Sequence, residues 1–75
     1  MKIEFSDHAL VQLKNRPRIK QTMVLATINS PDQATASHRQ RNLYRKYFGD
    51  EILEVVTVTD NDTIVVITQY FLDES

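Results

Sequence analysis

Nine side chains in this sequence are the candidates for moving a proton or holding a phosphate. They comprise one histidine, three hydroxyl residues and five cations: His8, Tyr44, Thr68, Tyr70, Lys46, Arg16, Arg39, Arg41 and Arg45. A neutral imidazole can accept a proton, and a tyrosine hydroxyl can donate one. Arginine binds phosphate in a bidentate manner, and lysine binds it as a point charge. These residue types therefore indicate proton transfer beside a bound phosphate.

Each of these residues also has an ordinary structural role that the sequence leaves open. His8 could pack over the start of a helix or donate to a backbone carbonyl. Tyr44 and Tyr70 could pack against cross-strand neighbours, the cations could protect a solvated edge, and Thr68 could simply favour a strand. His8 and His38 do not have the spacing of a metal site, so neither a metal nor another cofactor is expected.

The charged residues are segregated along the chain, although the net charge is only −1. Residues 8–48 contain eight lysines and arginines and a single acid, Asp32, whereas residues 49–75 contain seven acids and no base. A basic region of this kind could form a positive face for nucleic acid. Two solvated edges of opposite charge would give the same pattern.

The C-terminal third is predicted to form the centre of a sheet. Two runs rich in β-branched and aromatic residues, 52–59 and 63–72, flank the acidic stretch Asp60-Asn61-Asp62. This pattern is typical of a β-hairpin with a three-residue connection, in which Asn61 or Asp62 takes a positive φ. The second run is apolar on both alternations, so we expect it to be covered on both faces.

Two helices are expected between a first strand, residues 1–5, and this hairpin. Ser6 is a good N-cap for a helix that must end before Pro17, and an apolar stripe predicts a second helix over residues 19–29. Residues 37–48 are then predicted to form a strand that ends at a turn. The order β-α-α-β-β-β predicts an α+β fold, with two helices packed on one face of a small antiparallel sheet.

The pairing of the last two strands decides which polar residues meet. Pairing Thr59 with Thr63 across the connection places Glu54, Thr68 and Tyr70 on one face. The sequence therefore predicts a polar site on that face of the hairpin.

The cations that join this polar site depend on the preceding turn. If residues 49–50 alone form the loop, Arg41 and Arg45 point to the site. One extra loop residue would bring Tyr44 and Lys46 to it instead. Because a one-residue shift reverses every side chain of a strand, both arrangements stay open.

The length of the chain, 75 residues, is that of one domain with a small core, so we expect a single domain over residues 1–75. Self-association as a homodimer, or a partner protein, would add buried surface. The sequence has no cysteine, no signal-peptide pattern and no apolar run that could span a membrane. We therefore expect a soluble, cytoplasmic protein that does not enter a membrane.

Several short motifs, taken together and in this order, resemble one known family. They are Ser6-Asp7-His8-Ala9, Arg16 with Ile19, Pro31, Arg41 with Tyr44 and Lys46, and Val66-Ile67-Thr68-Gln69-Tyr70. The set is similar to a domain family of unknown function related to the RelE and ParE toxins, within the barnase–EndoU–colicin–RelE group of ribonuclease folds. The resemblance covers nearly the whole chain. This sequence departs from the family pattern at Gln12, where arginine is common, and at Lys20, where serine is common.

The resemblance implies a compact RelE-like domain that acts as a toxin and is paired with an antitoxin protein. It implies metal-independent cleavage of RNA, with catalytic roles for His8, Tyr44, Lys46, Thr68 and Tyr70, and with phosphate contacts from Arg16, Arg39, Arg41 and Arg45. Some relatives, ParE-like ones among them, are not nucleases. The alternative is therefore a non-catalytic module of the same fold that binds protein or RNA.

Overall fold

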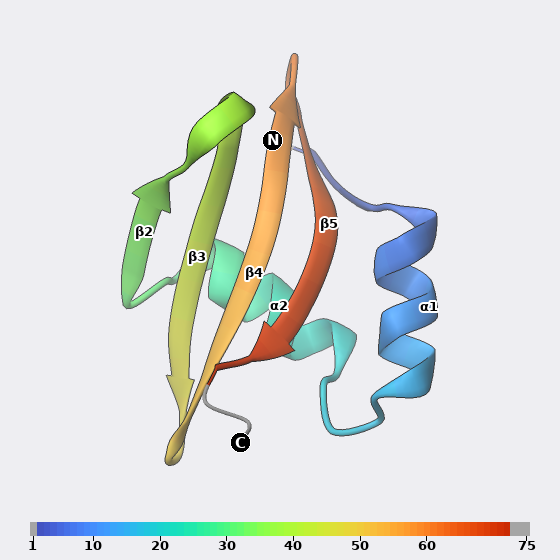
Figure 1. The fold of residues 1–75 in the computed structure, drawn as a ribbon, viewed down its shortest axis with the longest axis vertical. Helices are drawn as coiled ribbons and strands as arrows, with labels where there is room; N and C mark the ends of the chain where they lie inside the picture. Colours follow the sequence, from blue (N-terminus) through green and yellow to red (C-terminus); the bar gives the residue numbers. More distant parts are fainter. Residues whose placement is uncertain (1, 73–75) are drawn as a thin grey trace.

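The computed structural model describes residues 2–72, with His38 described through its backbone only. The elements are β1 Lys2–Phe5, α1 Asp7–Asn15, α2 Gln21–Asn29, β2 Gln33–Ala36, a 3₁₀ turn His38–Gln40, β3 Arg41–Phe48, β4 Glu51–Asp60 and β5 Thr63–Phe71. Five strands form one sheet in the order β1-β5-β4-β3-β2. In Figure 1, α2 crosses behind this sheet and α1 lies beyond β5. The predicted α+β fold with two helices on a sheet is therefore confirmed.

The core lies between the helices and one face of the sheet, which we call the covered face. Leu53 and Val55 of β4 point into it and are completely buried. The apolar residues buried together there are Ala9, Ile19, Val24, Ile28, Leu53, Val55, Ile64, Val66 and Phe71. Both helices and the strands β4 and β5 thus share one small core.

Helix α1 begins and ends where the sequence predicts. Ser6 is its N-cap, and its Oγ accepts a hydrogen bond from the Ala9 backbone N–H at 3.1 Å. The helix ends at Asn15, before Pro17. The buried Gln69 side chain of β5 donates from Nε2 to the Ala9 carbonyl at 3.1 Å. This bond fixes α1 against the covered face.

Helix α2 begins at Gln21, two residues later than predicted. Its N-cap residue, Lys20, has no side-chain oxygen to accept from the first-turn amides. The Lys20 backbone N–H instead donates to the sulfur of Met23 at 3.5 Å. Ile19 belongs to the preceding turn, where its N–H donates to the Arg16 carbonyl at 3.0 Å.

The sheet differs from the predicted one at both edges. Residues 33–36, Gln-Ala-Thr-Ala, form an additional strand, β2, antiparallel to β3 and exposed throughout. The strand predicted over residues 37–48 begins only at Arg41, after a turn in which Arg39 and Gln40 have positive φ values of 60° and 64°. At the other edge, β1 pairs in parallel with β5, so the sheet is mixed rather than antiparallel.

The last hairpin also has a different register. Asp60 pairs with Thr63, so the connection has two residues rather than three, and Asn61 takes a positive φ of 56°. Thr57 pairs with Val66 while Val56 pairs with Thr68, which leaves Ile67 as an extra residue in β5. The predicted pairing of Thr59 with Thr63 is therefore wrong.

The second face of the sheet, which we call the open face, carries no helix among residues 2–72. We expected β5 to be covered on both faces, but in residues 2–72 the helices cover only one face. No helix in this part of the chain is long and apolar enough to cross a membrane.

Candidate functional site

Three polar side chains meet on the open face, one from each central strand. Glu54 of β4 pairs with Arg45 of β3 on one side and with Tyr70 of β5 on the other. Arg45 Nε donates to Glu54 Oε1 at 2.7 Å, and the Tyr70 hydroxyl donates to Glu54 Oε2. Glu54 is only 4% exposed. We call Arg45, Glu54 and Tyr70 the open-face cluster.

The Tyr70 hydroxyl is held in its protonated form. Its pKa is raised from 10.0 to about 12, mainly by burial and also by the hydrogen bond and negative charge of Glu54, while Arg45 lowers it. Tyr70 is therefore a hydrogen-bond donor at neutral pH, and the acceptor is the buried carboxylate of Glu54.

Two more of the candidate residues belong to the open face. Thr68 pairs with Val56, and Arg41 pairs with Val58, so both point to the same side as the cluster. The sequence prediction that Glu54, Thr68 and Tyr70 share a face is confirmed, although the register that led to it is wrong.

Tyr44 and Lys46 lie on the covered face. Phe48 pairs with Glu51, so residues 49–50 form the two-residue turn that brings Arg41 and Arg45 to the open face. Tyr44 packs against the core. Lys46 Nζ donates to the carbonyl of Ser30, at the C-terminal end of α2, where a positive charge is favourable. The structure does not bring Tyr44 and Lys46 together with Thr68 and Tyr70.

The remaining candidates are spread over other parts of the fold. His8 is exposed on α1, next to the buried Ala9 that packs on the covered face. Arg39 is exposed in the 3₁₀ turn, and Arg16 is the C-cap of α1. None of the three contributes to the open-face cluster.

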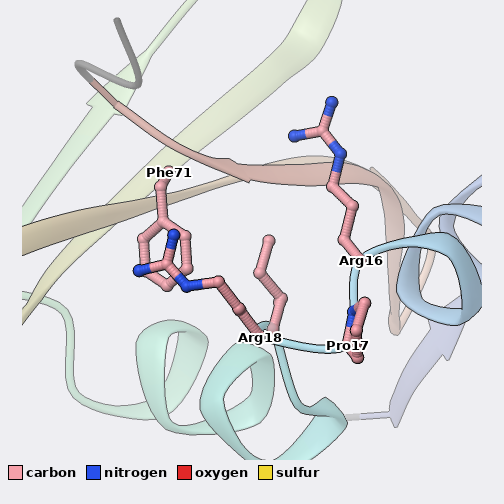
Figure 2. Close-up of a pocket in the computed structure, with 5 residues that line it drawn as sticks. Arg16, Pro17, Arg18 and Phe71 are labelled. Carbon is pink, nitrogen blue, oxygen red and sulfur yellow. The ribbon is translucent and has the colours of Figure 1, made fainter.

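Arg16 lines a hollow of about 510 Å³ together with Pro17, Arg18, Ile19 and Phe71. Figure 2 shows the Arg18 guanidinium over the Phe71 ring, at 5.1 Å from Cζ to the ring centroid, while Arg16 extends away from it. Arg18 also pairs with Glu51. This hollow belongs to the helix side of the molecule, so it is separate from the open-face cluster.

A second hollow, of about 460 Å³, lies on the open face and is lined by Asp32, Gln33, Arg45, Tyr47 and Ile52. It borders the open-face cluster, because Arg45 belongs to both. Tyr47 is 64% exposed, the largest exposure among the big apolar and aromatic side chains of residues 2–72.

The chain from residue 5 to residue 71 matches a family described as a domain of unknown function, DUF4258. The chain belongs to the DUF4258 family. No curated protein and no solved structure gives a significant match. The matched region runs from the end of β1 to the end of β5, so this DUF4258 domain includes both helices, the open-face cluster and both hollows.

For the DUF4258 domain, sequence reasoning placed Glu54 on the polar face without giving it a catalytic role, and it missed Tyr47. Glu54 could have been given that role as the one acid within the β-branched run of residues 52–59. Tyr47 could have been found from its alternation with Arg45 on β3, once a two-residue turn was assumed. Among the residues that the structure describes, no three His, Cys, Asp or Glu side chains gather closely enough to hold a metal ion.

Proposed function

We propose that this domain is a RelE-like toxin domain that cleaves RNA without a metal, through the open face of its sheet. The Arg45–Glu54–Tyr70 cluster is the observation that carries the proposal. It supplies a buried carboxylate that is hydrogen-bonded to a cation through one oxygen and to a protonated tyrosine through the other. Together these are a base, a phosphate ligand and an acid, the groups that such cleavage needs.

Glu54, rather than His8, is the base in this arrangement. It accepts the proton of the RNA 2′-hydroxyl while the 2′ oxygen bonds to phosphorus. Arg45 and Arg41 stabilise the charge on the phosphate oxygens. The bond from phosphorus to the 5′ oxygen then breaks, and Tyr70 donates its proton to that oxygen. Because Tyr70 is hydrogen-bonded to Glu54, the proton taken up by the carboxylate can return to the tyrosine.

The resemblance to toxins supports a role for the domain beside an antitoxin protein, with cytoplasmic RNA as substrate. The open face is where RNA would bind, and an antitoxin would act by covering it. A homodimer with the open face accessible is compatible with the same chemistry.

The test is cleavage of a mixed single-stranded RNA in the presence of EDTA. We expect the parent protein to cleave and Glu54→Gln to be slower by at least about a hundredfold, the usual contribution of a general base. Glu4→Gln is the matched control, because Glu4 is an exposed acid on β1. His8→Ala should cleave like the parent. A hundredfold loss in His8→Ala with full activity in Glu54→Gln would restore the sequence-based assignment and contradict ours.

One observation favours the alternative of a non-catalytic module. Both carboxylate oxygens of Glu54 already have partners, Arg45 and Tyr70, as expected for a cross-strand cluster that only stabilises the sheet. In that case the protein would not cleave RNA in any variant. RNA affinity that falls steeply with salt would then indicate an RNA-binding module. A salt-insensitive complex with a protein would indicate a protein-binding one.

A further inference from the structure

Beside the open-face cluster, the second hollow combines an exposed aromatic ring with a fixed carboxylate. We infer that it is a subsite for one base of a single-stranded RNA, which stacks on Tyr47 and donates a hydrogen bond to Asp32. This inference rests on the proposed function, because it deepens the same site. It adds a base-reading position to a cluster that by itself contacts only the phosphate and the ribose.

The position of Tyr47 suits stacking. The other aromatic residues of β3, Tyr44 and Phe48, pack against the core, whereas Tyr47 points to the open face and is 64% exposed. Its cross-strand partner is Ile52, which forms an apolar wall of the same hollow. An aromatic ring on an uncovered sheet, next to an arginine, is the arrangement on which single-stranded bases stack.

Asp32 is held in place by two hydrogen bonds to β3, one from its backbone and one to its carboxylate. The Asp32 backbone N–H donates to the Arg45 carbonyl at 2.8 Å. Asp32 Oδ2 accepts from the Tyr47 backbone N–H at 2.9 Å. Within residues 2–72, Oδ1 has no hydrogen-bond partner. One carboxylate oxygen is thus available beside the exposed ring.

The hollow is continuous with the groups that would hold the backbone of the RNA. Arg45 lines the hollow and also binds Glu54, so a phosphate bound at Arg45 leaves its neighbouring base beside Tyr47. The same continuity favours RNA over a protein segment as the occupant, because the adjoining face already offers arginine and hydroxyl groups suited to phosphate.

The chemistry of Asp32 predicts which bases fit. An ionised carboxylate only accepts hydrogen bonds. Adenine, cytosine and guanine each present an amino group on the Watson–Crick edge. Uracil presents one N–H between two carbonyl oxygens, which a carboxylate repels. The subsite should therefore disfavour uracil.

The test uses short deoxyoligonucleotides, which lack the 2′-hydroxyl and cannot be cleaved by the proposed route. Fluorescence anisotropy would compare the binding of labelled oligo(dC) and oligo(dU). We expect the parent to bind oligo(dC) several-fold more tightly. Tyr47→Ala should weaken oligo(dC) binding about tenfold, and Tyr47→Phe should retain it.

Two further variants make the test specific. Asp32→Asn keeps an oxygen for the Tyr47 N–H but removes the charge, so it should abolish the difference between the two oligonucleotides. Val11→Ala is the matched control for loss of an exposed side chain, because Val11 lies on α1 and is 53% exposed. It should bind like the parent. Circular dichroism would confirm that each variant is folded.

The outcomes separate this inference from the proposed function. RNA cleavage by the parent, with equal oligonucleotide affinity in Tyr47→Ala, would overturn the subsite and leave the function standing. If the parent neither binds oligonucleotides nor cleaves RNA, both fall. Loss of a protein complex in Tyr47→Ala, without any oligonucleotide binding by the parent, would overturn the subsite in favour of a protein contact.

Discussion

The two faces of β4 are buried almost equally, but by different means. Leu53 and Val55 on the covered face are 0% exposed beneath the helices, while Glu54 and Val56 on the open face are 4% and 8% exposed with no helix over them in residues 2–72. On the open face, side chains from neighbouring strands supply the cover, and Arg45 and Tyr70 do so for Glu54. Low exposure therefore marks an apolar core on one face and a polar cluster on the other.

The largest expected effect is loss of stability from a substitution on the covered face. Leu53→Ala should lower the free energy of unfolding by about 2–5 kcal/mol, because the helices cannot collapse fully into the cavity. Val56→Ala is the corresponding substitution on the open face, and it removes one carbon fewer. It should cost only about 1 kcal/mol, since water can enter the space it leaves. Urea denaturation of both variants would measure the difference, and equal losses would show that the open face is packed like the covered one.

A smaller effect is expected from Tyr70→Phe, which removes a hydrogen bond to a buried carboxylate. We expect a loss of about 1–2 kcal/mol at neutral pH. Because the pKa of Tyr70 is raised from 10.0 to about 12 in the folded protein, its contribution is fully present below pH 10 and is lost as the pH rises through 12.

Denaturation curves at several alkaline pH values would test this dependence. The parent should lose more stability between pH 10 and pH 12 than Tyr70→Phe does, since the two proteins share every other titrating group. An equal loss of stability in both proteins would show that the pKa of Tyr70 is not raised in solution. The hydrogen bond from Tyr70 to Glu54 would then be absent from the open face.

The smallest effect should come from Gly49→Ala, in the turn that assigns side chains to the two faces. Gly49 has a φ of +67°, and an added Cβ would meet no atom within 4 Å. The only cost is therefore backbone strain, which the lower entropy of the unfolded chain partly offsets. We expect the free energy of unfolding to fall by about 0.5–1 kcal/mol. Thermal denaturation would measure it. A much larger loss would mean that the turn rearranges and that the assignment of residues to the faces changes with it.

The parts of the fold that sequence predicts well are those with a local cause. Ser6 and Pro17 bound α1 through a cap and a steric restriction, and both act within a few residues. The strands β4 and β5 follow from dense β-branched runs. By contrast, β2 has four exposed residues and no apolar side chain larger than alanine, so its hydrogen bonds to β3 are what make it a strand.

The candidate site was harder to predict because it depends on register. The Ile67 bulge and the two-residue turn at residues 61–62 together change every pairing in the last hairpin. The face of Tyr44 and Lys46 depended on one loop residue, which the sequence left open. Glu54 was placed on the correct face, but its burial between Arg45 and Tyr70 follows from three strands at once, which no local pattern encodes.

The pairing of β1 with β5 has a consequence for how the protein is made. Residues 2–5 lie beside residues 63–66, so β1 has no partner in the sheet until β5, about sixty residues later, has been synthesised. β5 also pairs with β4. Until it does so, the part of the core that surrounds Leu53 and Val55 is incomplete. Contacts between such distant segments form late and close large loops. The sheet is therefore completed only when β5 joins it, and β1 cannot be added before that.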